Sequence, residues 1–281
     1  MNAASCRIAS FNAENFFMLL DRDYRRDEYD ALSEADYLAM NTSIFNPNKE
    51  RSKLQAIADT ILAGNFDVIG LCEVGGMETL QNFNRLYLDN AYNCFLHQEN
   101  SRRGIFVGAL IRRGRFRDIK ARNVRGNFSR NLLRLDLSDG WSSLKIFVVH
   151  LKSQYGQDKG IEQRIKEVNE LCSLLPRDRC VVMGDFNGLA IPGQHQFEFE
   201  PFLELPFRDV LEAMDVPPNE RFTHYYFSDQ PHFNQLDYIF ISNDLPVTDG
   251  RVIMDLVPLN FEQRRRMPSD HLFIEASIKL I

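Results

Sequence analysis

The octapeptide Val181–Gly188 constrains the fold of this chain more than any other stretch. Its sequence, VVMGDFNG, begins as a short apolar run with β-branched residues and ends in glycine, aspartate and asparagine. The run predicts a buried strand, and the residues after it favour a tight turn. Asp185 and Asn187 would then lie at a strand end, where open α/β sheets usually bind their ligands. The octapeptide alone fits equally well a turn in which Asp185 or Asn187 only hydrogen-bonds its own backbone.

The length and composition fit one α/β domain. The chain has 281 residues, and 44% of them are hydrophobic, which is enough for a large packed core. No internal repeat, low-complexity tract or linker divides the sequence. We therefore expect a single domain over residues 1–281. A polar stretch without clear periodicity at about residues 21–50 predicts an insertion, partly helical, over the strand ends.

The sequence contains neither an apparent membrane segment nor an apparent export signal. Its apolar runs are shorter than the ~18 residues of a membrane helix, and residues 1–7 lack the apolar core of a signal peptide. We expect a soluble, cytoplasmic protein without stable membrane association. The cysteines lack C-x-x-C spacing, which disfavours a disulfide framework or structural zinc and predicts reduced thiols. They are Cys6, Cys72, Cys94, Cys172 and Cys180.

Basic side chains are concentrated in one part of an acidic chain. The formal net charge is -6, so the protein as a whole is not a polycation that would bind nucleic acid through bulk charge. Between Arg102 and Arg134, however, lie eleven basic residues and a single acid, Asp118. This block predicts a surface that meets a polyanion. The alternative is a charged and solvated sheet edge.

Two amphipathic patterns predict helices that each precede an apolar strand. Apolar residues recur at helical spacing from Leu54 to Ile61, and Gly64 is the expected C-cap of that helix. A second helical pattern covers residues 161–175 and leads into the strand that ends at Asp185. Both connections are typical of an α/β fold.

Polar residues also stand at the ends or turns of several other expected strands. Burying the carboxylate of Glu73 without a partner would be costly, so we expect it to be solvated or bound. A lone histidine such as His150 is more often a structural hydrogen-bonder than a catalyst. The full set of polar groups at strand ends or turns is Asn12, Glu73, His150, Asp185, Asn187, Asp237 and the pair Asp270–His271.

This set of side chains favours metal-assisted hydrolysis of a phosphate ester. Carboxylates and carboxamides are hard oxygen ligands, which suit Mg²⁺ or Mn²⁺ better than zinc. A sparse site of this kind leaves a metal ion free to meet a phosphate oxygen. The two histidines can orient a water or exchange protons with it. Acyl transfer fits less well, because the sequence has no G-x-S-x-G motif, and no G-x-x-x-x-G-K-[ST] phosphate loop is present.

Six short motifs, taken in order, resemble the endonuclease/exonuclease/phosphatase superfamily. This group includes deoxyribonuclease I, exonuclease III-like repair endonucleases, neutral sphingomyelinases and inositol polyphosphate 5-phosphatases, and the motifs are most similar to bacterial extracellular nucleases. The resemblance implies an α/β (α+β) fold, a four-layer sandwich of two packed mixed β-sheets with helices outside. The motifs are SFNAEN at residues 10–15, LCEV at 71–74, VHLKS at 149–153, GDFN at 184–187, LDY at 236–238 and SDH at 269–271.

The resemblance also implies a metal site and its ligands. Glu73 is expected to be the principal ligand of Mg²⁺, with Mn²⁺ as a possible substitute. Asn12 would lie close by, and Asp270 would be a further ligand on the far side. Glu14 stands where some repair endonucleases have an aspartate near the metal.

The remaining motif residues are expected to act on the phosphate. Asp185 and Asn187 would orient the attacking water and contact the scissile phosphate. Asp237 would hold the ring of His271, which would act as general base or bind the phosphate. His150 would contact the phosphate and assist the leaving group, although no acid that pairs with it is evident in the sequence.

The resulting hypothesis is a Mg²⁺-dependent nuclease that cleaves DNA or RNA. Arg130 and the run Arg264, Arg265 and Arg266 are the expected contacts to the nucleic acid backbone. A phosphodiesterase or phosphatase for a phospholipid or inositol phosphate head group is the alternative, since basic residues would serve it equally well. No apolar hairpin of a membrane-docking enzyme is evident. A non-catalytic binding module is a remote third hypothesis.

Overall fold

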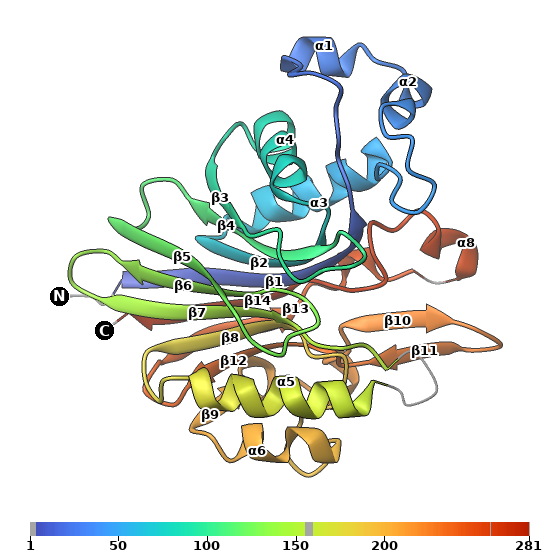
Figure 1. Cartoon of the computed structure of the whole chain (residues 1–281). Coiled ribbons are helices and arrows are strands. Elements are labelled where there is room, and N and C mark those ends of the chain that lie inside the picture. The colour runs from blue at the N-terminus through green and yellow to red at the C-terminus, as the bar shows by residue number, and fades with distance from the viewer. Residues whose placement is uncertain (1–3, 155–159, 259, 281) are drawn as a thin grey trace.

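The fold is a sandwich of two β-sheets with helices on both outer faces (Figure 1). The computed structural model describes residues 4–154, 160–258 and 260–280. The strand order of the first sheet is β13 (Val247–Val252), β14 (Ile274–Leu280), β1 (Ala4–Phe16), β2 (Val68–Val74), β4 (Phe106–Arg112) and β3 (Tyr92–Leu96). The order of the second sheet is β5 (Asp118–Val124), β6 (Leu132–Ser138), β7 (Ser143–His150), β8 (Cys180–Asp185), β12 (Asp237–Ser242) and β9 (Phe207–Asp209). The four layers confirm the fold class expected from the sequence.

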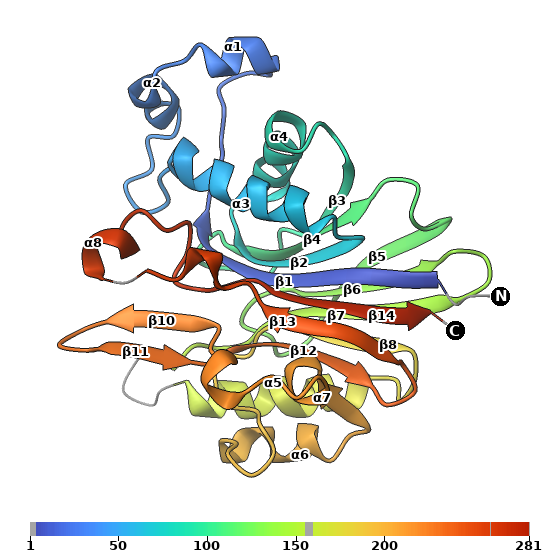
Figure 2. The same ribbon diagram turned by 180° about the vertical axis from the view of Figure 1, so that it is seen from behind.

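Helices cover the outer face of each sheet (Figures 1 and 2). The first sheet carries α3 (Arg51–Gly64) and α4 (Met77–Tyr87), and the second carries α5 (Ile161–Leu174) and α6 (Glu200–Leu203). No helix in the described part of the chain has both the length and the apolar character needed to cross a membrane. The shorter elements are α1 (Arg26–Asp30), α2 (Glu34–Ala39), α7 (Val210–Ala213), α8 (Phe261–Arg264), three 3-10 turns at Phe197–Phe199, Pro218–Glu220 and Met254–Leu256, and a separate hairpin of β10 (His224–Phe227) and β11 (Pro231–Asn234).

Three apolar cores fill the spaces between the layers. Along β8, Val181 and Met183 face the core between the sheets, whereas Cys180 and Val182 face the core beneath α5. The strand β2 alternates in the same way. Since successive side chains of a strand point to opposite faces, strands buried on both sides must be apolar throughout. This requirement explains the continuous apolar runs in the sequence. All five cysteines are free, as expected.

The strand directions bring several strand ends to one edge of the sandwich. β1 and β2 run parallel in the first sheet, and β7 and β8 run parallel in the second. β12 is antiparallel to β8, so its first residue, Asp237, pairs with the last residue of β8, Asp185. β14 is antiparallel to β1, so the segment just before β14 reaches the same edge. We call this edge the catalytic edge, because the residues predicted to be catalytic, among them Asp185, Asp237 and His271, lie at it.

The expected helix C-cap at Gly64 is wrong by one residue. Gly64 is the last helical residue of α3, and Asn65 is the C-cap, with φ 49° and ψ 43° in the left-handed region. Asparagine adopts this region more readily than most residues. Gly64 is small for a different reason, because an added Cβ would lie 2.0 Å from the ring of Phe66.

The polar segment at residues 21–50 is partly helical, as expected, but its helices do not lie over the strand ends. Two buried tyrosines anchor the segment to the helices that cover the first sheet. The hydroxyl of Tyr29 in α1 lies 3.0 Å from that of Tyr87 in α4, and Tyr37 of α2 donates to the carbonyl of Lys49 at 2.9 Å. Apolar burial of these rings decides the position of α1 and α2. After α2, Asn46 reaches the carbonyl of Arg103 at 3.2 Å, close to the catalytic edge.

Asp209 is a buried carboxylate at the end of β9, away from the catalytic edge. Its side chain accepts hydrogen bonds from Gln235 Nε2 at 2.9 Å and from the backbone N–H of Leu211 at 3.4 Å. Burial raises the pKa of Asp209 to about 7. Oε1 of Gln235 has no hydrogen-bond partner among the described atoms, so the amide can turn and accept a hydrogen bond from the O–H group of a neutral Asp209.

We predict that Asp209→Asn removes a pH dependence of stability. In the native protein the folded state binds a proton at Asp209 more tightly than the unfolded state, whose pKa is about 3.9. The contribution of Asp209 to the free energy of unfolding should therefore be highest below pH 4. It should fall by on the order of 4 kcal/mol as the pH rises to about 7.

Urea unfolding from pH 4 to 8 measures this difference. Asp249→Asn, at an exposed position of β13, is the control, and an equal pH slope in native and Asp209→Asn protein contradicts the prediction.

Candidate active site

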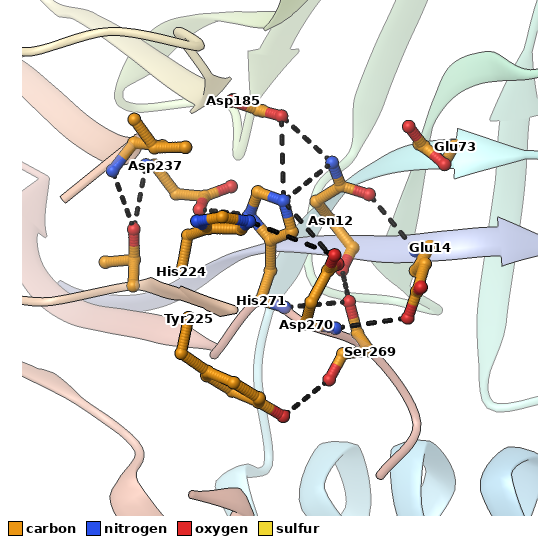
Figure 3. A network of polar contacts seen from close by, with 12 residues as sticks. Asn12, Glu14, Glu73, Asp185, His224, Tyr225, Asp237, Ser269, Asp270 and His271 are labelled. Atoms are coloured by element: carbon orange, nitrogen blue, oxygen red, sulfur yellow. Dashed lines mark hydrogen bonds and ion pairs between the residues drawn. The ribbon is translucent and has the colours of Figure 1, made fainter. Parts of the chain in front are cut away.

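The polar residues predicted from the strand ends meet at the catalytic edge (Figure 3). They surround a small cavity of about 200 Å³. Asp237 is fully buried beneath His271, and the other predicted catalytic and metal-binding residues line the cavity. The lining residues are Asn12, Glu14, Asn15, Glu73, Arg103, Arg130, His150, Ser153, Asp185, Asn187, Asp270 and His271.

Irregular backbone at the strand ends aims several of these side chains into the cavity. Glu14, Asn15, Glu73 and Asn187 have φ values of 43°, 51°, 62° and 52°. The pairing of β1 with β2 shifts register between Asn12 and Phe16, and that of β2 with β4 shifts between Leu71 and Val74. Left-handed conformations cost energy in residues with a Cβ, and they are retained mainly where the surrounding structure and function require them.

Gly184 permits the close approach of β7 and β8 that places His150 beside Asp185. Its φ is 135°, and an added Cβ would lie 2.0 Å from the carbonyl oxygen of Val149. Only glycine fits this contact. The register then pairs His150 directly with Asp185.

Asp185 connects side chains from both sheets. Its Oδ2 accepts hydrogen bonds from Asn12 Nδ2 at 2.9 Å and Asn187 Nδ2 at 3.1 Å, and His150 Nε2 lies 3.4 Å away. Its Oδ1 accepts the backbone N–H of Asn187 at 2.8 Å. The local turn considered from the sequence is therefore present, but it uses only one of the two oxygens. Burial and the nearby carboxylate of Asp237 raise the pKa of Asp185 above its usual value, although the donors oppose this shift.

His271 and Asp237 form a buried ion pair. His271 Nδ1 lies 2.6 Å from Asp237 Oδ2, so Nε2 faces Asp185 at 4.0 Å. Burial disfavours the charged ring, but Asp237, Asp185 and Asp270 together raise the pKa of His271 well above its usual value. Ser269 fixes the segment, because its hydroxyl donates to the carbonyl of Asn12 and accepts the backbone N–H of His271. The predicted pairing of Asp237 with His271 is thus present in the structure.

His150 has the opposite electrostatic environment. Burial, followed by the positive charges of Arg130 and His271, lowers the pKa of His150 well below its usual value. Its Nδ1 is buried and has no hydrogen-bond partner in the part of the chain that the structure describes. No carboxylate is therefore seen to pair with Nδ1. Nε2 faces Asp185 and, at 3.9 Å, Oε1 of Glu73.

The oxygen ligands predicted for a cation divide into two groups. Glu73 lines the cavity and stands apart from the linked residues in Figure 3, and its Oε2 accepts the backbone N–H of Asn15 at 3.0 Å. Glu14 is already paired with Arg264 at 2.8 Å and accepts the backbone N–H of Asp270 at 3.1 Å. Asp270 also lies 3.6 Å from Arg264. Of these carboxylates, Glu73 is the one without a paired cation among the contacts described, so it is best placed to hold a metal ion.

Two other groups of side chains have ligand atoms within 4.8 Å of one another. These groups are Asp185, Asp237 and His271, and His224, Asp270 and His271. Both would use His271, which is occupied at Nδ1 by Asp237 and favours its protonated form. A protonated imidazole cannot bind a metal ion. Hard oxygen ligands near Glu73 therefore fit a divalent cation better.

The basic residues do not form one surface. Arg112, Arg113 and Arg115 lie at the far end of β4, and Arg115 pairs there with Asp67 at 3.3 Å. The basic block is divided between two ends of the sheets, because β4 leads away from the catalytic edge and β5 leads back toward it. Near the site, Arg130 donates to the carbonyl of Leu151 at 3.1 Å and lines the cavity.

The three predicted arginines before Asp270 occupy different environments. Arg264 is half-buried, pairs with Glu14 and Asp270, and lies over the ring of Tyr225 at 5.8 Å. Arg265 and Arg266 are exposed at the end of α8. Arg264 thus orders the acidic residues of the site, and the two exposed arginines remain available to a ligand.

His224 and Arg103 belong to the site but were not identified individually from the sequence. His224 Nε2 lies 3.8 Å from Asp270, and its ring centroid lies 4.7 Å from that of His271. Burial and His271 lower the pKa of His224. His224 is the first residue of the aromatic strand β10, and none of the six motifs includes it. Arg103 donates to Asn15 Oδ1 at 3.1 Å. Its place in the basic block was the only sequence feature that pointed to a role for Arg103 in the site.

The fold is shared with known proteins. A sequence model of the Endonuclease/Exonuclease/phosphatase family matches residues 9–271. No curated protein matches this chain at a significant level. A crystal structure of D. rerio TDP2 complexed with a single-strand DNA product matches with a TM-score of 0.65 and 18% identity, covering 98% of this chain and 99% of that one.

Two further solved structures have the same fold. The human Nocturnin catalytic domain with bound sulfate matches with a TM-score of 0.60 and 18% identity, covering 99% of this chain and 94% of that one. A mannosyl-6-phosphatase from Bacteroides thetaiotaomicron matches with a TM-score of 0.61 and 15% identity, covering 97% of this chain and 99% of that one. These likenesses show the fold, and the family model covers almost the whole sequence. The chain therefore belongs to the Endonuclease/Exonuclease/phosphatase family, a membership that supports hydrolysis of phosphoric esters.

Proposed function

We propose that this protein is a divalent-cation-dependent nuclease that hydrolyses phosphodiester bonds of DNA or RNA. Mg²⁺ is the proposed cofactor, and Mn²⁺ is the expected substitute. The basic cavity next to the site is the observation that supports a nucleic acid as the substrate. This cavity of about 780 Å³ is much larger than the catalytic cavity of about 200 Å³, and Arg103 and Arg130 line both.

The shape and charge of this neighbouring cavity favour an extended polyanion. Arg102, Arg103, Arg130 and Lys152 all line it, and no acidic residue is among its lining residues in the described chain. The catalytic cavity has room for one phosphate, so a longer substrate must continue beyond it. A nucleic acid strand would place its next phosphates along these cationic side chains. D. rerio TDP2, which has the same fold, was solved with a single-strand DNA product.

Each part of the site has a proposed task in attack by water on the phosphate. A divalent cation held by Glu73, with Asn12 nearby and Asp270 on the far side, would act as a Lewis acid toward a phosphate oxygen. Asp185 and Asn187 would hold the attacking water. The raised pKa of Asp185 makes its carboxylate a competent proton acceptor near neutral pH.

The two histidines differ in charge and therefore in their proposed tasks. His271, kept protonated by Asp237, would bind a phosphate oxygen and stabilise the charge that develops there. His150, favoured as the neutral form, would contact the phosphate near the leaving oxygen. A phosphatase for a small head group would need the same chemistry but not the adjoining basic cavity.

The first experiment measures cleavage of supercoiled plasmid, single-stranded DNA and RNA with Mg²⁺. We expect Glu73→Gln and Asp185→Asn each to reduce the rate by about a hundredfold or more. EDTA should abolish cleavage, and Mn²⁺ should restore it. Glu78→Gln, at an exposed position of α4, is the matched control and should cleave like the native protein. Release of phosphate from small monoesters without cleavage of any strand would contradict the nuclease proposal.

Salt dependence of binding tests the basic cavity separately from catalysis. In the inactive Asp185→Asn background, Arg103→Ala should weaken binding of a nucleic acid strand. It should also reduce the slope of log K against log salt by about 1. Arg113→Ala removes an exposed arginine of the same basic block at the other end of the sheets, so it should leave the slope unchanged. Equal effects of the two variants would show that the cavity does not hold the strand.

The pH profile tests the proposed charge of His271. Asp237 raises the pKa of His271, so Asp237→Asn should lower that pKa. If activity requires protonated His271, the alkaline fall of kcat/KM should then move to lower pH by about 1 unit or more. Circular dichroism at each pH controls for folding. An unchanged alkaline limb in a folded, active variant would rule out a protonated His271 in the rate-determining step.

A further inference from the structure

The hairpin β10–β11 extends from the catalytic edge on the same side as α8 (Figures 1 and 2). The two strands pair as His224 with Asn234, Tyr225 with Phe233 and Tyr226 with His232. His224 enters the site, where it forms an isolated bridge with His271. The hairpin is thus attached to the catalytic residues at its base, and the proposed function gives its outer part no task.

The hairpin packs against the protein at Tyr225, and its opposite face is open at Tyr226. Tyr225 is fully buried, and its hydroxyl donates to the carbonyl of Ser269 at 2.7 Å. Because side chains alternate along a strand, His224 and Tyr226 lie on the opposite face. Tyr226 is 45% exposed, and His232, its cross-strand partner, is also exposed. We call this open side the aromatic face.

The rings of the aromatic face form a continuous series that starts at the catalytic histidine. The ring centroids of His271 and His224 are 4.7 Å apart, and those of His224 and Tyr226 are 6.0 Å apart. Tyr226 then stacks on His232 at 4.4 Å with an interplanar angle of 8°. The hydroxyl of Ser228 lies 3.0 Å from His232 Nε2, which holds that ring in place. The pair therefore offers a flat and preorganised surface that His224 connects to the catalytic edge.

We propose that Tyr226, backed by His232, stacks on a base of a single-stranded substrate next to the phosphate that is cleaved. This inference rests on the proposed nuclease function and narrows its substrate. In a duplex the bases are paired and stacked on one another, whereas an unpaired base is free to stack on an aromatic ring. Stacking of this kind tolerates any base, because every base has a flat π-face.

The polarity of the hairpin favours a nucleic acid strand over a lipid surface. Arg264 of α8 lies over Tyr225, so the positive charge of α8 stands behind the hairpin and not on the aromatic face. The connection between the strands, residues 228–230, is Ser-Asp-Gln, which is polar and unsuited to insertion into a bilayer.

The test compares Tyr226→Ala with native protein on two single strands of equal length. One is ordinary DNA, and the other carries an abasic sugar phosphate at every position. We expect Tyr226→Ala to reduce kcat/KM on ordinary DNA by about tenfold and to leave cleavage of the abasic strand unchanged. Tyr226→Trp should retain activity because it keeps a stacking ring. Trp141→Ala removes a ring that is 99% exposed in the turn between β6 and β7, at the far end of the sheets, and should have no effect.

The possible outcomes separate failure of this inference from failure of the nuclease proposal. Native protein that cleaves neither strand, nor plasmid or RNA, in the presence of Mg²⁺ would overturn both. If Tyr226→Ala cleaves ordinary DNA as fast as native protein does, only the stacking role is overturned. An equal loss on the ordinary and abasic strands would also overturn it, because the ring would then act on the site and not on a base. Equal cleavage of single strands and duplex by native protein would contradict the preference for unpaired substrate.

Discussion

The hydrogen bond from Asn12 to Asp185 joins the two sheets at the catalytic edge, and the site depends on it. Asn12 lies on the first sheet and Asp185 on the second, with Nδ2 and Oδ2 separated by 2.9 Å. A buried carboxylate is costly unless donors surround it. The donors here come from both sheets and from the turn after β8, so the packing of the sheets and the register of their strands must agree. A shift of one residue in β8 would turn Asp185 to the opposite face.

The same dependence on surroundings gives two histidines of one site opposite properties. His271 has Asp237 at 2.6 Å and further carboxylates nearby, which favour the charged ring despite its burial. His150 is as deeply buried and lacks a carboxylate at Nδ1, and its burial together with the positive charges of Arg130 and His271 favours the neutral ring, although Asp185 and Glu73 lie near Nε2. Identical side chains thus take different protonation states because their partners differ. This difference underlies the separate tasks proposed for them.

The sandwich supplies the reacting groups, while the segments around it shape access to them. A basic cavity opens on one side, between Arg103 and Arg130, and the aromatic face of the β10–β11 hairpin lies on another side of the site. Both are built by segments outside the central strands. Proteins of one fold commonly differ in substrate through such segments, because loops can change without disturbing the core. The four-layer core alone therefore indicates phosphoric ester hydrolysis more directly than it indicates the substrate.

Much of the fold and the site could be predicted from the sequence, because both depend on patterns that are local. Strands buried on both faces, such as β2 and β8, must be apolar throughout, and the polar residue that ends each one is conspicuous. Glu73, His150 and Asp185 were found in this way, and the ordered motifs indicated how the layers are arranged. Helix capping was less accurate, since the crowding of Gly64 by Phe66 involves contacts that no spacing rule expresses.

Other features were decided only when distant segments came together. His224, the first residue of β10, belongs to none of the motifs, and it joins the site because it forms a bridge with His271, 47 residues later in the chain. The basic block looked continuous along the chain, but β4 and β5 carry its members to opposite ends of the sandwich. Residues 21–50 took their place through two buried tyrosines that pack against helices further along the chain. The sequence by itself determined which residues could be buried and which polar groups would end strands, since these follow from the composition of each segment. Tertiary structure decided the neighbours, and with them the charge of each histidine, because electrostatic and packing energies depend on distances in space.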